Sequence, residues 1–181
     1  MATPFRPAVA LLQQYAEYHR DRRNILTHFV GVPMIVFAVG VFLAGIHFAV
    51  GATSVTLAWV AFTVVGLWYL SRGHLGIGLA TTLFVGVLMV LAHQVSGGTA
   101  GQWAAWWLGF FVVGWIIQFV GHYYEGRKPA FADDLVGLLV GPMFVVLEML
   151  APLGLFRGLM QDIERHAGPT FIRDLAHPVA R

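Results

Sequence analysis

The chain consists of long apolar runs separated by short polar or glycine-rich breaks. Residues 24–124 contain a single charged side chain, Arg72. About a quarter of the residues in soluble domains are charged, so an uncharged run of this length indicates that lipid surrounds it. Segments of about 20 residues are long enough to cross a bilayer as helices. The pattern therefore predicts an all-α, polytopic membrane helix bundle with four transmembrane spans, near residues 25–49, 54–71, 75–95 and 103–124.

Further helices are predicted on either side of this block. Residues 8–20 place Val9, Leu12, Tyr15 and Ala16 at helical spacing, which is typical of an N-terminal amphipathic helix lying on the membrane surface. A fifth apolar stretch follows at 135–156. It contains two prolines and a glutamate, which favour a bent or re-entrant helix over a straight crossing. Whether this segment crosses the membrane is left open by the sequence.

The predicted domain organisation is simple. Residues 1–156 form a single membrane-embedded helical domain, and residues 157–181 form a polar cytosolic tail. Seven Lys and Arg residues lie before the first predicted span, between the second and third, or just after the fourth, whereas the two opposite loops contain none. Because lysine and arginine mark the cytosolic side, the N-terminus is expected to be cytosolic.

Composition narrows the chemistry. Hydrophobic residues make up 58% of the chain and charged residues 11%, and the net charge of +2 is too small for electrostatic binding of nucleic acids. The chain has no cysteine, which excludes disulfides, iron–sulfur clusters and thiolate-bound zinc or haem. Histidine and carboxylates are therefore the strong metal ligands that remain.

The apolar block retains five histidines, and ionisable groups inside membranes are costly and often functional. Four crossings return the chain to the side from which it started. His47 and His93 then lie at the opposite face, about 30 Å away. The histidines that can share one site are the remaining ones near the starting face: His19, His28, His74 and His122.

Spacing brings further polar residues to the same place. Gln118, His122 and Glu125 follow one another at i, i+4 and i+7, which places them on one helical stripe, and Asn24 and His28 form a second i, i+4 pair. Three imidazoles with an optional carboxylate can bind Fe(II) or Zn(II). Fe(II) would activate O2 and Zn(II) would support hydrolysis. The residues alone do not choose between these metals.

Two segments resemble the signatures of the 2-hydroxy fatty acid dioxygenase family. This family includes the endoplasmic-reticulum enzyme of phytosphingosine breakdown and many bacterial members once labelled a domain of unknown function. The resemblance covers roughly residues 10–155. The matching residues are Tyr18-His19, Asn24, His28 and Gly31-Val32-Pro33, then Trp115-Ile116-Ile117-Gln118-Phe119-Val120-Gly121-His122, Glu125, Pro129-Ala130 and Asp134-Leu135.

The resemblance implies an Fe(II)-dependent enzyme of fatty acid α-oxidation. Such an enzyme uses O2 to cleave a long-chain 2-hydroxy fatty acid to the acid one carbon shorter, and His19, His28 and His122 would be its iron ligands. It would be an integral protein of a bacterial inner membrane, in contact with lipids, with the metal site on the cytosolic side. Some family members have a second histidine where this chain has Arg20, so no role of that histidine carries over.

Other residues receive roles on the same hypothesis. Gln118 and Glu125 are the candidate catalytic residues, with Glu125 either a fourth ligand or a partner that orients a histidine. The candidate substrate-binding residues are Asn24, Arg20, Arg127 and Lys128, although the cations are equally well explained as topology and headgroup anchors.

Two alternative functions remain from the sequence. One is a zinc-dependent membrane hydrolase that uses the same histidines. The other is a non-enzymatic membrane carrier or scaffold. A carrier needs polar groups throughout the bilayer, so His47 and His93 would then matter as much as His28.

Overall fold

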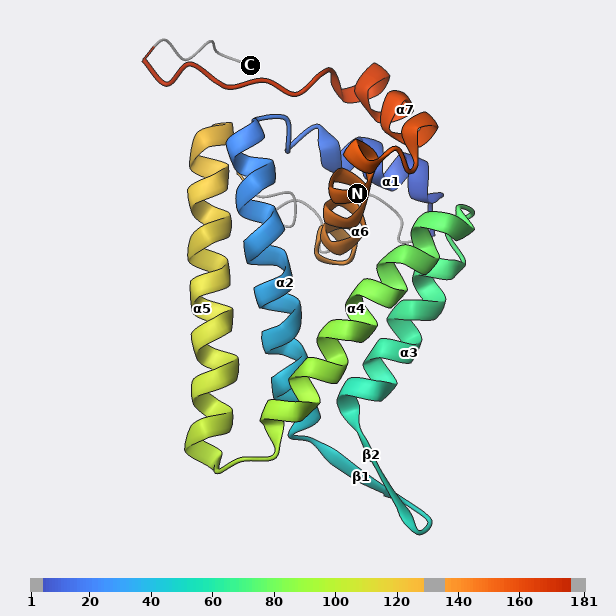
Figure 1. Cartoon of the computed structure of the whole chain (residues 1–181), viewed down its shortest axis with the longest axis vertical. Coiled ribbons are helices and arrows are strands. Elements are labelled where there is room, and N and C mark those ends of the chain that lie inside the picture. Colours follow the sequence, from blue (N-terminus) through green and yellow to red (C-terminus); the bar gives the residue numbers. More distant parts are fainter. Residues whose placement is uncertain (1–4, 129–135, 177–181) are drawn as a thin grey trace.

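The structure, a computed structural model, describes residues 5–128 and 136–176. The described part is mostly helical, and long helices stand side by side with short ones gathered at one end (Figure 1). The helices are α1 (Ala8–Ala16), α2 (Arg22–Ala44), α3 (Leu57–Leu70), α4 (Leu75–Ser96), α5 (Ala100–Glu125), α6 (Val136–Leu150), the 3₁₀ turn η2 (Ala151–Leu153) and α7 (Arg157–Ala167). The all-α class is thereby confirmed.

Helices α2 and α5 pack closely along their length. A Cβ atom added to Gly31 of α2 would lie 2.9 Å from the backbone oxygen of Gly114 on α5 and 2.6 Å from the side-chain Nε2 of Gln118. Glycine therefore allows the two backbones to approach each other more closely than any other residue would. This pairing aligns the start of α2 with the end of α5 (Figure 1).

A β-hairpin replaces the turn expected between the first two predicted spans. Strands β1 (His47–Val50) and β2 (Thr53–Thr56) pair antiparallel, with His47 opposite Thr56. Gly51, at φ +60°, occupies the first turn position, where a two-residue hairpin loop favours glycine. The helices α2 and α3 are thus shorter than the predicted spans 25–49 and 54–71. Their adjoining ends carry valines and threonines, which favour strands.

Within the described residues, four helices are long and apolar enough to cross a membrane: Arg22–Ala44, Leu75–Ser96, Ala100–Glu125 and Val136–Leu153. They fit a membrane protein. Helix α3, the remainder of predicted span 54–71, has 14 residues, fewer than the roughly 20 that cross a bilayer alone. Helix α6 occupies only the upper half of the molecule, beside α1 (Figure 1). The predicted start of the fifth segment at residue 135 lies outside the described residues.

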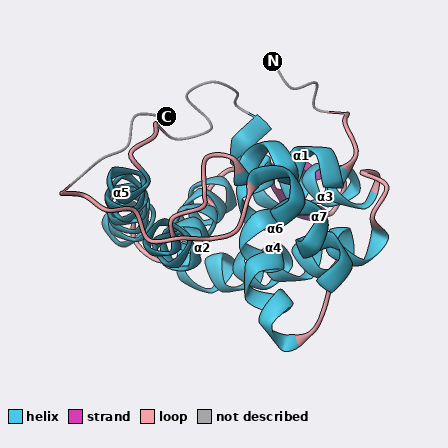
Figure 2. Ribbon diagram, turned by 90° about the horizontal axis from the view of Figure 1, so that it is seen from above, coloured by secondary structure: helices cyan, strands magenta, loops and turns pink. Residues whose placement is uncertain are grey.

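Helices α1 and α7 cover the end of the bundle where α2 begins (Figures 1 and 2). Leu11 and Leu12 of α1 are buried and belong to a core that also contains Leu159 and Ile163 of α7. The apolar face of α1 therefore packs against protein, and the position of this helix at the membrane surface stays a prediction. The first part of the predicted polar tail is likewise packed. Amphipathic periodicity identifies a face that must be covered, but it does not identify what covers it.

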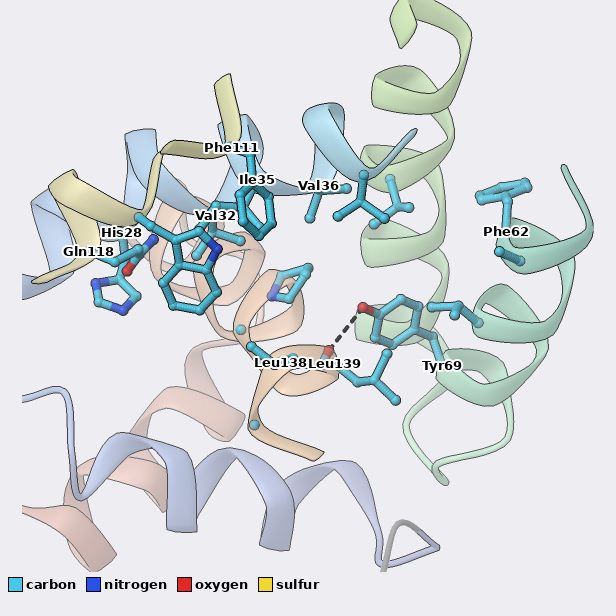
Figure 3. A pocket seen from close by; sticks show the side chains of 18 of the residues that line it. His28, Val32, Ile35, Val36, Phe62, Tyr69, Phe111, Gln118, Leu138 and Leu139 are labelled. Carbon is cyan, nitrogen blue, oxygen red and sulfur yellow. Dashed lines mark hydrogen bonds between the residues drawn. The ribbon is translucent and has the colours of Figure 1, made fainter. Parts of the chain in front are cut away.

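A cavity of about 410 Å³ lies among α2, α3, α4, α5 and α6 (Figure 3). Its lining is apolar over most of its length, and polar side chains meet it mainly at the end where α2 begins. Tyr69 crosses to α6 and donates a hydrogen bond to the Leu139 carbonyl at 2.9 Å. The described lining residues are Tyr15, His28, Val32, Ile35, Val36, Val39, Leu43, Ala61, Phe62, Val65, Tyr69, Val85, Met89, Phe111, Trp115, Gln118, His122, Gly137, Leu138, Leu139, Gly141 and Pro142.

We predict that Gly31→Ala destabilises the protein by about 1–3 kcal/mol, because the added methyl group overpacks the contact with the α5 backbone. Gly109→Ala on α5 is the control, since a Cβ atom there meets nothing within 4 Å. Thermal unfolding midpoints in detergent should fall for the first variant and not for the second. Equal midpoints would show that the helices do not depend on this close approach.

Candidate metal centre

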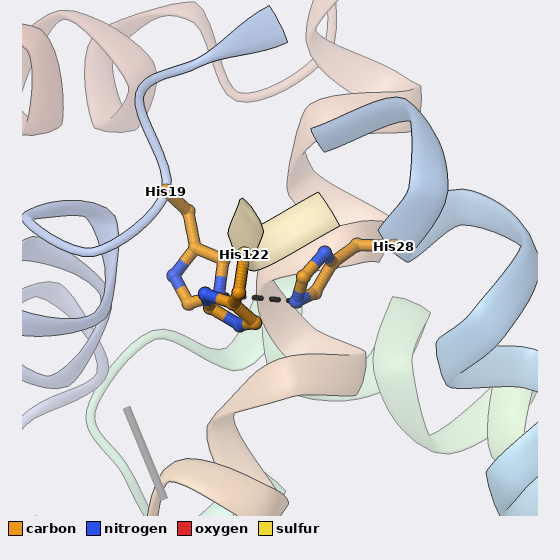
Figure 4. Close-up of side chains that lie close together, drawn as sticks. All are labelled: His19, His28 and His122. Atoms are coloured by element: carbon orange, nitrogen blue, oxygen red, sulfur yellow. Dashed lines mark hydrogen bonds between the residues drawn. The ribbon is translucent and has the colours of Figure 1, made fainter. Parts of the chain in front are cut away.

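Three histidines from two ends of the chain meet in one cluster (Figure 4). His19 lies in the turn between α1 and α2, His28 in the second turn of α2, and His122 in the last turn of α5. Each offers a ring nitrogen within 4.8 Å of the others. The residues are 0%, 2% and 6% exposed, respectively. The structure thus brings together the three residues singled out from the sequence, and their role as metal ligands stays a prediction.

Hydrogen bonds determine which ring nitrogens face each other. His19 Nδ1 lies 2.7 Å from the Tyr15 carbonyl oxygen, and His28 Nδ1 lies 2.8 Å from that of Asn24. Because a carbonyl oxygen only accepts, both Nδ1 atoms carry hydrogen, and in the neutral rings both Nε2 atoms carry lone pairs. The two Nε2 atoms are 3.1 Å apart. Two lone pairs at this distance repel each other unless a cation or a proton lies between them.

This separation suits two ligands of one ion. Nitrogens held about 2.1 Å from a metal at roughly a right angle lie about 3 Å apart. Metal-bound histidines commonly donate their other ring N–H to a backbone carbonyl, as His19 and His28 do here. The local geometry therefore fits a pair of imidazoles prepared for a metal ion.

His19 is further fixed by Tyr15. The two rings are stacked, with centroids 4.0 Å apart and planes within 3°. Burial lowers the pKa of His19 well below its usual value, and the neighbouring His28 and His122 lower it further. The ring is therefore neutral at pH 7, as a metal ligand must be. The contribution of Tyr15 was missed from the sequence, although its i, i+4 spacing from His19 was the available signal.

Hydrogen bonds to Glu125 join the α1–α2 turn to the end of α5. Its Oε2 accepts hydrogen bonds from the backbone N–H groups of Arg20 at 3.0 Å and Asp21 at 2.8 Å, and from the side-chain amide of Asn24 at 3.1 Å. These bonds position the turn that carries His19 against the helix that carries His122. The geometry supports an orienting role for this carboxylate.

Several buried polar atoms around the histidines have no hydrogen-bond partner within the described part of the chain. They are Asn24 Oδ1, Gln118 Nε2, His122 Nδ1 and Glu125 Oε1. Buried polar atoms are nearly always paired, and two of these residues, Gln118 and His122, line the cavity beside His28, where an ion or a polar ligand would satisfy them. Imidazoles with a nearby carboxylate and amide suit a divalent transition metal. The residues present therefore fit Fe(II) or Zn(II).

Arg20 and Asn24, two of the predicted substrate contacts, are both bonded to other parts of the protein. The Arg20 guanidinium is buried and pairs with Glu148 Oε1 at 3.0 Å. It also donates hydrogen bonds to three backbone carbonyls, one of them that of Gly168. The Asn24 amide donates to Glu125 and to the Tyr18 carbonyl. Both side chains thus hold the protein together, a role that depends on distant partners and is invisible in local sequence.

The other two predicted substrate contacts lie outside the cluster. Arg127 donates a hydrogen bond to the Glu17 carbonyl at 2.8 Å, and Lys128 is exposed. Neither is among the described residues that line the cavity. Their positions agree with the alternative interpretation as anchors.

The segment after α7 crosses over the α1–α2 turn. Two backbone hydrogen bonds join residues 20–22 to Phe171, and the Arg173 N–H donates to Asp21 at 2.8 Å. Burial raises the pKa of Asp21, but hydrogen bonds from Arg23 and Arg173 outweigh this effect, so the net pKa is lowered. An ionised Asp21 therefore caps the N-terminus of α2 and, through Arg173, also holds the segment after α7 in place. No pattern in the sequence predicted that this segment covers the turn.

The remaining histidines of the apolar block lie apart from the cluster. His74 is the N-cap of α4, and His47 is exposed on the hairpin. His93 lies 2.8 Å from Thr56 Oγ1 and 2.7 Å from the Met89 carbonyl, and its ring stacks on Trp59. These contacts give His74 and His93 structural roles.

Comparison with known proteins identifies similar chains. The family model "2-hydroxy-palmitic acid dioxygenase Mpo1-like" matches residues 5–72 and 67–153, which contain the three clustered histidines, Gln118 and Glu125. The "2-hydroxy-palmitic acid dioxygenase MPO1" of Saccharomyces cerevisiae is 33% identical over 158 residues, covering 83% of each chain. No solved structure matches the chain.

We predict that His28→Ala lowers the amount of bound divalent metal more than about tenfold, since it removes one of the facing nitrogens. His47→Ala is the matched control, because His47 is exposed at the other end of the molecule. Metal content is measured by mass spectrometry on anaerobically purified protein loaded with Fe(II). Retention of the wild-type metal content by His28→Ala would contradict the assignment.

Proposed function

The chain belongs to the family of 2-hydroxy-palmitic acid dioxygenase Mpo1-like proteins, and on this premise we propose that it is an Fe(II)-dependent 2-hydroxy fatty acid dioxygenase. The proposed reaction converts a 2-hydroxy fatty acid and one O2 into the fatty acid one carbon shorter, with carbon 1 released as CO2 and one water formed. The observation that carries the proposal is the cluster of three buried imidazoles at one end of an apolar cavity.

His19, His28 and His122 would hold the iron. Bound Fe(II) would supply the one-electron chemistry with O2 that amino-acid side chains lack. The protein contributes position and environment. Tyr15 of α1 and Phe144 of α6 pack against the buried His19 ring, and Glu125 fixes the turn that carries His19.

The cavity would receive the substrate with its polar end at the histidines. Gln118 is 4% exposed, lines the cavity beside His28 and His122, and has an unpaired amide nitrogen. An amide N–H at this place can donate a hydrogen bond to the carboxylate or 2-hydroxyl of the substrate. No lysine or arginine is among the described lining residues, so neutral donors and the metal would orient the polar end.

We propose a topology in which α2, α3 with its hairpin, α4 and α5 cross the membrane and α6 re-enters from the side of the metal cluster. The confinement of α6 to the half of the molecule next to α1 supports this arrangement (Figure 1). By the distribution of Lys and Arg, the cluster would face the cytosol. A bacterial inner membrane remains the proposed location.

The alternatives differ in what they require of the cavity. A carrier needs polar groups along its path, whereas the described lining between the two ends of this cavity is apolar. His93, which a carrier would use, is already bonded to Thr56 and Met89. A zinc hydrolase would use the same cluster, so only a comparison of the iron-loaded and zinc-loaded protein distinguishes it from a dioxygenase.

The test uses protein purified without oxygen, loaded with Fe(II) or Zn(II), and incubated with 2-hydroxypalmitate and O2. The iron form should consume O2 and release the acid one carbon shorter, detected by mass spectrometry, and the zinc form should not. Stoichiometric zinc in the purified protein with no O2 uptake in any form would overturn the proposal.

We predict that Gln118→Leu lowers kcat/KM for the 2-hydroxy acid by about 10- to 100-fold, as expected for losing a hydrogen bond to a charged group. Metal content should stay unchanged, which separates this effect from loss of the metal site. Gln102→Leu, at the other end of α5, is the control. Equal kinetics of the two variants would remove Gln118 from the reaction.

A further inference from the structure

We propose, building on the function above, that the depth of the cavity selects the length of the acyl chain, and that Val36 and Leu43 of α2 and Met89 of α4 set this depth. The name of the family refers to a 2-hydroxy acid and assigns no residue to its acyl chain. The lining residues supply that assignment.

Two helical stripes lead away from the histidines. On α2 the lining residues recur after His28 once per helical turn: Val32, then the neighbours Ile35 and Val36, then Val39 and finally Leu43. On α5 they precede His122 in the same way: Gln118, Trp115 and Phe111. Such spacing keeps each series on one face of its helix. The two stripes therefore lie side by side, and both lead from the metal cluster into the bundle.

Helical rise converts these positions into depth. Val36 lies eight residues beyond His28, which is about 12 Å, and Leu43 lies fifteen residues beyond, which is about 22 Å. One leaflet of a bilayer offers about 15 Å of hydrocarbon. A cavity longer than a leaflet is thick can hold a long, straight acyl chain, and a volume of about 410 Å³ is within the range of ligand sites.

The far end of the cavity is bounded by Leu43 and Met89. Met89 is 5% exposed and packs against Gly40 of α2, where an added Cβ atom would lie 2.6 Å from the Met89 methyl carbon. This contact draws α4 onto α2 below the cavity. Removing the Met89 side chain should therefore lengthen the space, and enlarging Val36 should divide it.

The described lining distinguishes substrates by the length of their acyl chain. Apart from the groups near the histidines, it offers no charged side chain to a substrate. Affinity along the chain then comes from burial of methylene groups, each contributing about fourfold in binding. A residue that excludes the last few methylenes lowers the affinity for long chains and leaves that for shorter chains unchanged.

The experiment compares Val36→Phe, Leu43→Phe and Met89→Ala with the control Val30→Phe. Val30 is on α2 but is 52% exposed on the outer surface. Each protein is reconstituted in nanodiscs, and kcat/KM is measured for saturated 2-hydroxy acids from medium to very long chains. Binding of the corresponding non-hydroxylated acids to metal-free protein is measured separately by displacement of a fluorescent fatty acid.

We expect Val36→Phe to lower kcat/KM for long-chain acids by more than about tenfold and to leave kcat/KM for medium-chain acids unchanged. Leu43→Phe should lose only the longest chains, and Met89→Ala should shift the optimum towards longer ones. Val30→Phe should match the wild type. Because Met89→Ala acts in the opposite direction, general destabilisation cannot produce the whole pattern.

The proposal is overturned if kcat/KM depends on chain length in the same way for Val36→Phe and Val30→Phe. It is also overturned if Val36→Phe lowers kcat/KM by the same factor for every chain length. The binding series separates this failure from failure of the proposed reaction. If no protein turns over a hydroxy acid but the binding profiles shift as expected, the acyl site stands and the dioxygenase assignment falls. If turnover occurs and no profile shifts, only the length assignment falls.

Discussion

The arrangement of the site depends on two imidazoles that face each other without a hydrogen between them. His19 and His28 each give their Nδ1–H to the carbonyl oxygen four residues earlier. Each ring is therefore oriented by its own stretch of backbone. When the turn after α1 folds against α2, the two Nε2 lone pairs meet at 3.1 Å. A divalent cation would relieve this repulsion and bind both nitrogens, so the fold and the proposed metal would stabilise each other.

Distant parts of the chain hold this pair in place. Glu125 binds the turn from more than a hundred residues away, and Glu148 pairs with Arg20 beneath it. A buried ion pair contributes little to stability on its own, because desolvation offsets most of the attraction. Its clearer effect is on position, since losing either partner would leave a buried charge beside the histidines. The segment after α7 closes the same turn from outside.

Much of the site followed from the sequence because topology and helical spacing are physical constraints. An uncharged block with three turns had to return His122 to the level of His28, and the i, i+4 spacing had to align Gln118 with His122. The hairpin at residues 47–56 escaped prediction because a short run of valine and threonine suits a strand as well as a helix end. The burial of α1, the pairing of Arg20 with Glu148 and the cover by Phe171 escaped because each depends on a partner that only the fold brings near.

The absence of a cation among the described lining residues follows from the charge of the proposed complex. A divalent ion held by three neutral imidazoles, counted together with the Glu125 carboxylate at the same end of α5 as His122, would have a net charge of +1. The carboxylate of one hydroxy acid then brings the buried site to neutrality. Arg20 does not alter this sum, because Glu148 neutralises it. An additional arginine at the head of the cavity would leave an uncompensated buried charge and would compete with the metal for the carboxylate. The cations near the proposed membrane boundary therefore lie where they are hydrated or donate to backbone carbonyls. The metal and Gln118 would then bind the polar end of the substrate.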